Sequence, residues 1–141
     1  MIILDTNVIS EGFRAKPHIA VRLWMDAQPP ETLFICAPVL AEIRYGIARL
    51  EAGAQQDRLR AGADKLETDQ YRGRILPFDA AAASIYGRLA AARERIGKPI
   101  GHMDGFIAAI AVAHEAVIAT RDRYGFSDFG LTIINPFEFK P

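Results

Sequence analysis

Short apolar runs alternate along the chain with longer stretches of helical pattern. The runs are rich in Ile, Leu, Val and Phe and are bounded by Asp, Pro or Asn, as buried strands are; they cover residues 1–4, 33–37, 74–78, 117–120 and 131–135. The helical stretches between them cover residues 18–28, 38–52, 54–69, 80–96 and 104–116. Continuously apolar strands are typical of a parallel sheet that is covered on both faces. The order therefore predicts an α/β fold, a three-layer sandwich with a mainly parallel sheet of roughly five strands flanked by helices.

The size and charge of the chain fit one globular domain spanning residues 1–141. Of its 141 residues, 50% are apolar and 24% are charged, a balance typical of a folded rather than a disordered protein. The formal net charge is zero, which argues against a domain held to duplex DNA by a general positive field. Thirteen of the 17 cationic residues are arginines, whose planar guanidinium binds phosphate well, so local phosphate contacts remain open.

Cysteine content and hydropathy indicate the compartment. Cys36 is the single cysteine, so neither an intrachain disulfide nor a cysteine-rich zinc site can form, which fits a reducing cytoplasm. The apolar start of the chain is interrupted by Asp5, too early for a signal peptide. The longest apolar stretch, 105–113, is about half as long as a membrane span. We expect a cytoplasmic protein with no membrane contact.

Two acidic residues follow predicted strands closely. Asp5 comes directly after the strand 1–4, and Asp122 comes just after the strand 117–120. Because parallel sheets form their sites at the carboxyl ends of the strands, both acids are expected at one edge of the sheet. Local roles stay open as well. Asp5 can cap a helix or a turn, and Asp122 can do the same or pair with a neighbouring arginine.

Two further acids lie on predicted helices. On an ideal helix Glu42 lies about 60° from Val39, which belongs to the apolar stripe, and Gly46, four residues on, offers it no cation. Asp104 begins the helix 104–116, where a carboxylate is favourable as an N-cap or as a first-turn anion. Each can still be an ordinary residue at a packing edge. Together with the strand-end acids, however, they place four carboxylates near one edge.

Four carboxylates gathered at one edge would repel one another and retain protons near neutral pH. A divalent cation removes that penalty. Oxygen ligands without a histidine or cysteine cluster favour Mg²⁺, with Mn²⁺ as a substitute, over Zn²⁺. The chemistry that most often uses such a site is phosphoryl transfer, in which the metal lowers the pKa of bound water and neutralises charge on the phosphate.

Other functional patterns are missing. The histidines (His18, His102 and His114) have no zinc-binding spacing, and the chain has neither a glycine-rich nucleotide loop nor a serine in a nucleophile elbow. Cys36 is expected in the core. The phenylalanines near the C-terminus (Phe126, Phe129, Phe137 and Phe139) are expected to pack in the core rather than to stack on bases.

Four segments in order resemble the motifs of PIN-domain nucleases. They are residues 3–10 (ILDTNVIS), 37–46 (APVLAEIRYG), 104–109 (DGFIAA) and 119–122 (ATRD). Any one of them is unspecific, but their order and separation are similar to those of the VapC/FitB branch. The members of that branch are toxins of bacterial type II toxin–antitoxin pairs. The resemblance covers essentially the whole chain.

The resemblance implies a Mg²⁺-dependent endoribonuclease whose catalytic acids are Asp5, Glu42, Asp104 and Asp122. Asp5 and Asp104 match the firmest metal positions, and the other two could complete the metal shell. Many relatives have Asn after the Thr-Arg pair and an Asp-Phe pair downstream, whereas this chain has both Asp122 and Asp128, so either could be the fourth acid. Asp122 is favoured because it directly follows the strand end.

Supporting residues and partners follow from the same resemblance. Asn7 is expected to hydrogen-bond to the acids and orient them, Thr120 to help shape the pocket, and Thr6 to support both. The arginines expected to hold phosphates beside the acids, unless they form surface salt bridges, are Arg44, Arg49, Arg121 and Arg123. The implied partners are RNA, a second copy of the chain, and a VapB/FitA-like antitoxin whose C-terminal segment covers the acids within a higher hetero-oligomer. Apolar contacts to partners could come from Ile9, Phe13, Leu23 and Trp24, unless these are buried in the monomer core.

Two other functions fit these residues less well. A haloacid-dehalogenase-like phosphatase also has an Asp after its first strand, but it needs a second Asp two residues on, where this chain has Asn7. A catalytically silent PIN-like module would bind RNA or protein without cleaving it. The presence of all four acids argues against such a module.

Overall fold

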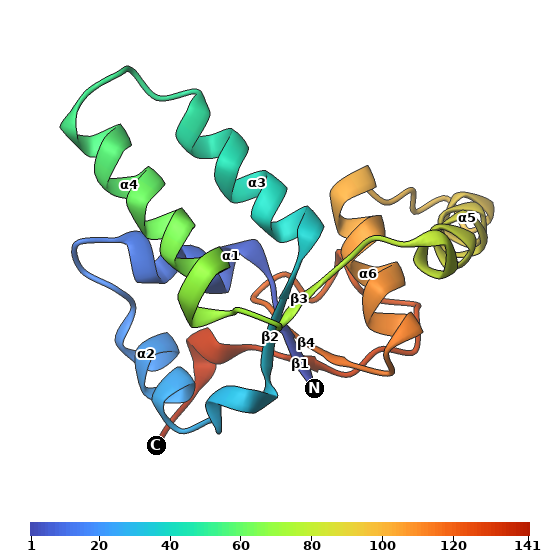
Figure 1. Cartoon of the computed structure of the whole chain (residues 1–141). Coiled ribbons are helices and arrows are strands. Elements are labelled where there is room, and N and C mark those ends of the chain that lie inside the picture. The colour runs from blue at the N-terminus through green and yellow to red at the C-terminus, as the bar shows by residue number, and fades with distance from the viewer.

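Five parallel strands form one sheet in the computed structural model, which describes residues 1–141 (Figure 1). The strand order is β3-β2-β1-β4-β5, and every neighbouring pair is parallel. The strands are β1 (Ile2–Leu4), β2 (Leu33–Cys36), β3 (Ile75–Leu76), β4 (Val117–Ala119) and β5 (Ile133–Ile134). The prediction of a parallel five-stranded α/β fold is confirmed. Each strand is one to three residues shorter than predicted.

Helices account for most of the remaining chain. The α-helices are α1 (Thr6–Ile9), α2 (Ile19–Asp26), α3 (Ala37–Ala48), α4 (Ala54–Lys65), α5 (Ala80–Arg95) and α6 (His102–Ala113). Short 3₁₀ helices are η1 (Ser10–Phe13), η2 (Pro30–Thr32) and η4 (Pro136–Glu138), and a π-helical turn, η3 (Leu66–Gln70), extends α4. All five predicted helices are present. α1 was not predicted, because a helix of four residues shows no periodicity in the sequence.

Asp104 lies at the start of its helix as predicted, as the first-turn anion and not as the N-cap. α6 starts two residues earlier, at His102, with Gly101 at the N-cap. Asp104 therefore lies in the first turn, where its charge is favourable next to the helix dipole, and it is not a capping residue.

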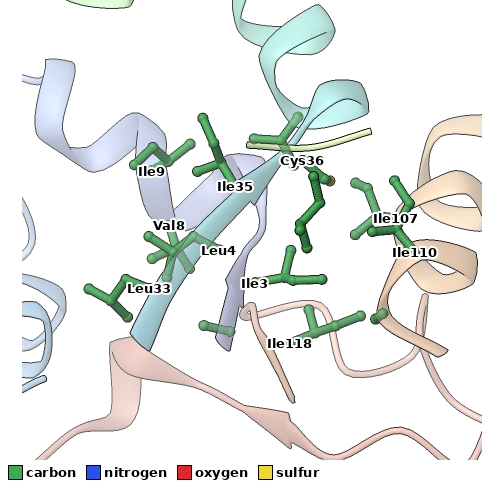
Figure 2. Close-up of a cluster of buried hydrophobic side chains, with 14 of the residues drawn as sticks. Ile3, Leu4, Val8, Ile9, Leu33, Ile35, Cys36, Ile107, Ile110 and Ile118 are labelled. Atoms are coloured by element: carbon green, nitrogen blue, oxygen red, sulfur yellow. The ribbon is translucent and has the colours of Figure 1, made fainter. Parts of the chain in front are cut away.

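The core fills both faces of the sheet. Figure 2 shows Ile3 and Cys36 on the side of Ile107 and Ile110 of α6, while the alternate strand residues point toward α1. Burial on both faces explains why the strands are continuously apolar. Cys36 is a core residue as predicted, and burial raises the pKa of its thiol to about 12, so the thiol stays protonated.

Two helical hairpins extend on opposite sides of the carboxyl ends of the strands. One is formed by α3 and α4, and the other by α5 and α6 (Figure 1). The first turns of α1, α3 and α6 and the loop after β4 therefore approach the same sheet edge, at which the sequence placed its acidic residues. No helix is both long enough and apolar enough to cross a bilayer.

Candidate functional site

Asp5 is buried where β1 passes into α1, and both of its carboxylate oxygens accept hydrogen bonds. Oδ1 accepts from the backbone N–H of Thr6 at 2.7 Å, so the predicted capping role is real. Oδ2 accepts from Thr120 Oγ1 at 2.7 Å and from Asn7 Nδ2 at 3.1 Å. Burial raises the pKa of the Asp5 carboxyl, the hydrogen bonds oppose that rise, and the charge of Asp122 adds to it.

Thr120 links the end of β4 to the end of β1, its neighbour in the sheet. Its side chain is fully buried, and its hydroxyl donates to Asp5 while accepting from Asn7 Nδ2 and from the backbone N–H of Asp122, both at 3.0 Å. Asn7 in turn accepts from the backbone N–H of Arg121 at 3.3 Å. These contacts agree with the expectation that Asn7 orients the acids, and they show that Thr120 contacts Asp5 directly.

Glu42 lies on the second turn of α3 and is half-buried. Its Oε1 accepts a hydrogen bond from Thr6 Oγ1 at 2.7 Å. Thr6 follows Asp5 directly, so this contact ties the carboxylate on α3 to the end of β1. This hydrogen bond agrees with the supporting role predicted for Thr6.

Asp104 and Asp122 face each other across Gly125. Asp122 is the most exposed of the four acids, and its Oδ1 accepts from the backbone N–H of Gly125 at 2.9 Å. A Cβ placed on Gly125 would lie 2.8 Å from Asp122 Oδ2 and 3.4 Å from Asp104 Oδ2. Both carboxylates thus approach the position that a side chain on residue 125 would occupy, and a glycine leaves that position empty.

The four carboxylates influence one another without a neutralising cation. The pKa of the Asp104 carboxyl is raised to about 6, first by burial and then by the charges of Asp5, Glu42 and Asp122. None of the four forms an ion pair with Lys, Arg or His. The charges of three acids therefore reach Asp104 without an ion pair to compensate them, and the assignment of all four acids to one site stays a prediction.

The donor set fits a hard divalent cation, although it is not a closed cage. No three acidic, histidine or cysteine side chains in the structure are already arranged around a common point for an ion. Mg²⁺ characteristically keeps several water ligands and takes only one or two carboxylates from a protein. An open group of carboxylates is thus compatible with Mg²⁺, whereas the tetrahedral nitrogen and sulfur ligands of a structural zinc site are missing.

Asp128, the alternative fourth acid, is held away from this group. Its Oδ2 lies 3.8 Å from Lys98 Nζ and accepts from Ser127 Oγ at 3.2 Å. Its backbone adopts a φ of 68°, a conformation that Asp and Asn tolerate better than most residues. The geometry favours Asp122 over Asp128 as the fourth acid.

The predicted phosphate-binding arginines differ in what they contact. Arg44 pairs with Asp64 at 2.8 Å, and Arg123 pairs with Glu138 at 2.6 Å, so both form the surface ion pairs that were the alternative. Arg49 lies over the Tyr45 ring, about two helical turns beyond Glu42. The guanidinium of Arg121 lies over Phe137 and pairs with no acid. Arg121 is therefore the arginine best placed for a phosphate beside the acids.

A cavity of about 520 Å³ lies between the α1–η1–α2 segment and α4, and none of the four acids lines it. Ile9 and Phe13 line it, and Leu23 is exposed nearby on α2. Trp24 is only 4% exposed, so its expected contribution to a contact surface is wrong and the core alternative holds. The histidines are exposed, and the C-terminal phenylalanines pack against the core as predicted.

Two residues next to the acids, Gly125 and Arg93, were not predicted from the sequence. Gly125 allows the close approach of Asp104 and Asp122, and Arg93 holds the carbonyl of Gly125 from the other side. Neither belongs to the segments that resemble known motifs. Only the spacing of Gly125 three residues after Asp122, typical of an aspartate-led turn, could have indicated it.

Comparisons with known proteins identify the family and the fold of the chain. The PIN domain family matches residues 2–130. The chain is 46% identical over 138 residues to VapC ribonuclease Y4jK of Sinorhizobium fredii, covering 98% of this chain and 99% of that protein. It is 38% identical over 137 residues to Toxin FitB of Neisseria gonorrhoeae, covering 97% and 99%. The solved structure of FitAB bound to an IR36 DNA fragment contains a chain that superimposes with a TM-score of 0.91 at 37% identity, covering 100% of this chain and 99% of that one.

Proposed function

The chain belongs to the PIN-domain family, and from that premise we propose that it is the toxin of a type II toxin–antitoxin pair, acting as a Mg²⁺-dependent endoribonuclease. The observation that carries the proposal is the group of four unpaired carboxylates at the sheet edge, three of which raise the pKa of Asp104. Relatives named as a VapC ribonuclease and as a FitB toxin support the same activity. Residues 1–141 would form a single PIN domain.

Asp5 and Asp104 would hold the ion, with Glu42 and Asp122 completing its inner or outer shell. A bound divalent ion lowers the pKa of water and neutralises charge on a phosphate, with Mn²⁺ as a plausible substitute for Mg²⁺. Because attack by water leaves the RNA 2′-OH out of the reaction, the expected products carry a 5′-phosphate and a 3′-hydroxyl. The expected substrate is RNA with single-stranded loops, whose bases are free of pairing.

The residues around the acids keep their carboxylates oriented and charged. Asp5 is held by donors from Thr6, Thr120 and Asn7, and Glu42 is held by the Thr6 hydroxyl. Asp104 must lose its proton before its carboxylate can bind a cation. Because its pKa is raised to about 6, cation binding and cleavage are expected to weaken as the pH falls below about 6. Arg121 would contact a phosphate of the substrate.

The proposal is tested by cleavage of total RNA with the purified chain, followed by analysis of the new ends. We expect cleavage with Mg²⁺ or Mn²⁺, none with excess chelator, and products with 5′-phosphate and 3′-hydroxyl ends. Undiminished cleavage in chelator, or cyclic phosphate ends, would contradict the metal mechanism. Release of inorganic phosphate from phosphomonoesters would indicate the phosphatase alternative. Metal-independent binding of RNA without cleavage would indicate the silent module.

A second copy of the chain and a VapB/FitA-like antitoxin are the proposed protein partners, in the cytoplasm. The superimposable structure was solved as FitAB on DNA, which supports an antitoxin partner and a higher hetero-oligomer. Physically, an antitoxin could place an arginine among the unpaired carboxylates and displace the cation. The cavity beside α1 and α4, whose wall includes the half-buried Phe13, offers apolar area for the same partner.

Light scattering after size exclusion tests the partners. We expect the chain alone to be a dimer and to form a larger complex when co-expressed with the product of the neighbouring reading frame. Phe13→Ala should weaken that complex at least about 10-fold, because it removes an aromatic anchor from the cavity wall. Ile96→Ala, a change at an exposed side chain outside the cavity, should not. A stable monomer that ignores the co-expressed product would contradict both partners.

A further inference from the structure

Arg93 is a buried cation without an acidic partner. Its residue is only 7% exposed, and no carboxylate pairs with it. Burying a guanidinium is unfavourable unless its donors are satisfied, so the groups that it contacts must explain why it is buried. Arg93 lies in the last turn of α5, at the far side of the loop that carries Asp122.

All hydrogen bonds of the Arg93 guanidinium go to backbone carbonyls, which belong to two separate segments. Nε donates to the carbonyl of Lys98 at 2.7 Å, in the turn between α5 and α6. Nη1 donates to the carbonyls of Ser127 at 3.0 Å and of Gly125 at 3.5 Å, in the loop between β4 and β5. The guanidinium carbon also lies 5.1 Å from the centre of the Phe129 ring. None of these carbonyls belongs to α5 itself, so the contacts do not serve to cap that helix.

The loop held in this way carries part of the acidic site. The N–H of Gly125 bonds to the Asp122 carboxylate, while the carbonyl of Gly125 accepts from Arg93. Gly125 is also the residue onto which Asp104 and Asp122 converge. Arg93 therefore contacts, from behind, the same residue whose N–H holds the Asp122 carboxylate.

We propose that Arg93 is a positioning residue of the acidic site, which holds the 122–127 turn through its carbonyl contacts and so keeps Asp122 facing Asp104. Its effect on RNA cleavage rests on the proposed function, but its effect on the turn does not. The planar guanidinium has five donors in a fixed fork and can bridge two segments at once. A lysine keeps the positive charge but, with a single ammonium, cannot reproduce this bridge. Arg93→Lys therefore removes the planar set of donors while it keeps the positive charge.

The matched control is Lys98→Ala. The Lys98 side chain also links the α5–α6 turn to the same loop, through Asp128 at 3.8 Å. This second link is an exposed ion pair, which contributes little to stability. Both variants thus remove one connection between the same two segments, but only Arg93→Lys disturbs the carbonyl contacts next to Asp122.

Three readouts test the proposal on the folded full chain: amide hydrogen exchange of residues 122–127, the dissociation constant for Mn²⁺, and kcat and KM on RNA. For Arg93→Lys we expect faster exchange at Gly125, Mn²⁺ binding weakened about 10- to 100-fold, and a matching loss in kcat. The KM for RNA should change less than about 3-fold. Lys98→Ala should match the wild type in all three.

The proposal would be overturned if folded Arg93→Lys showed the same amide exchange at Gly125 and the same Mn²⁺ affinity as the wild type. If Arg93→Lys does not fold, Arg93→Gln, which keeps a donor on the stem, takes its place with the same expectations. If the wild type binds no Mn²⁺ or cleaves no RNA, the proposed function fails, yet the exchange at Gly125 still decides whether Arg93 positions the turn. Exchange that rises equally throughout the chain would show a general loss of stability and would also overturn the proposal.

Discussion

Asp104→Asn is expected to reduce Mg²⁺-dependent RNA cleavage by at least about 100-fold, and Asp5→Asn by a similar factor. Loss of a residue that merely supports a metal ligand lowers activity or affinity about 10- to 100-fold, so loss of a direct ligand should exceed that range. Asparagine has nearly the same shape as aspartate but no negative charge. The loss would therefore report the charge needed to hold the cation.

The decisive assay compares initial cleavage rates of purified variants at saturating Mg²⁺ and pH 7.5. Asp128→Asn is the matched control, because Asp128 is paired with Lys98 outside the acidic group and Asn tolerates its positive φ. Asp122→Asn should lower the rate, whereas Asp128→Asn should not. A rate that persists in Asp104→Asn, or that falls only in Asp128→Asn, would show that the acids were assigned wrongly.

Thermal unfolding tests whether Asp104→Asn would lose cleavage merely because the variant is less stable. The folded pKa of Asp104, about 6, lies above the unfolded value of roughly 3.9. The unfolded state therefore binds fewer protons between these values, and this carboxyl lowers the stability of the metal-free protein as the pH rises from about 4 to about 6. Asp104→Asn lacks that penalty. Above pH 6 the variant should be at least as stable as the wild type, although it is inactive.

Thr120→Val is expected to lower the free energy of unfolding by about 3 kcal/mol. Valine fills the same volume but leaves the Asp5 carboxylate without one donor and the N–H groups of Asn7 and Asp122 without their acceptor. Each unsatisfied buried polar group costs about 1–3 kcal/mol, and part of this is recovered by water at the more exposed Asp122. For a chain of this size the expected fall in Tm is about 10 °C.

The pH dependence of stability distinguishes the loss of hydrogen bonds in Thr120→Val from a packing defect. Thr120 is the main donor that opposes the raised pKa of Asp5, so its removal should raise that pKa further. A group with a raised folded pKa destabilises the protein only where it is charged, hence the loss in Thr120→Val should be larger at pH 8 than at pH 4. Thr120→Ser keeps the hydroxyl and should keep most of the stability. An equal loss at both pH values, or in both variants, would contradict the hydrogen-bonding role.

The sequence made the fold and the four acids predictable for the same reason. Parallel strands must be covered on both faces, so they are recognisable as apolar runs, and their carboxyl ends must share one edge. Asp5 directly follows such a run, and Asp122 closely follows another. Glu42 was recognisable from its position beside an apolar helix stripe. These predictions need only local spacing and one rule about sheets.

The remaining parts of the site depend on contacts between distant segments. Arg93 meets the carbonyl of Ser127 from 34 residues away, and nothing in the arginine-rich end of α5 distinguishes it from its exposed neighbours. The start of α6 was misplaced because Gly101 caps the helix without a side-chain hydrogen bond, so no capping residue marks its start in the sequence. The ion pairs of Arg44 and Arg123 likewise depend on tertiary structure.

The central claim is that the four carboxylates at the sheet edge share a divalent cation. The most direct test is anomalous diffraction from crystals of the chain equilibrated with Mn²⁺. We predict one strong peak between Asp5 and Asp104, with metal–oxygen distances of about 2.1 Å and water in the remaining positions. No peak at that edge under saturating Mn²⁺, or a peak held by other residues, would contradict the account.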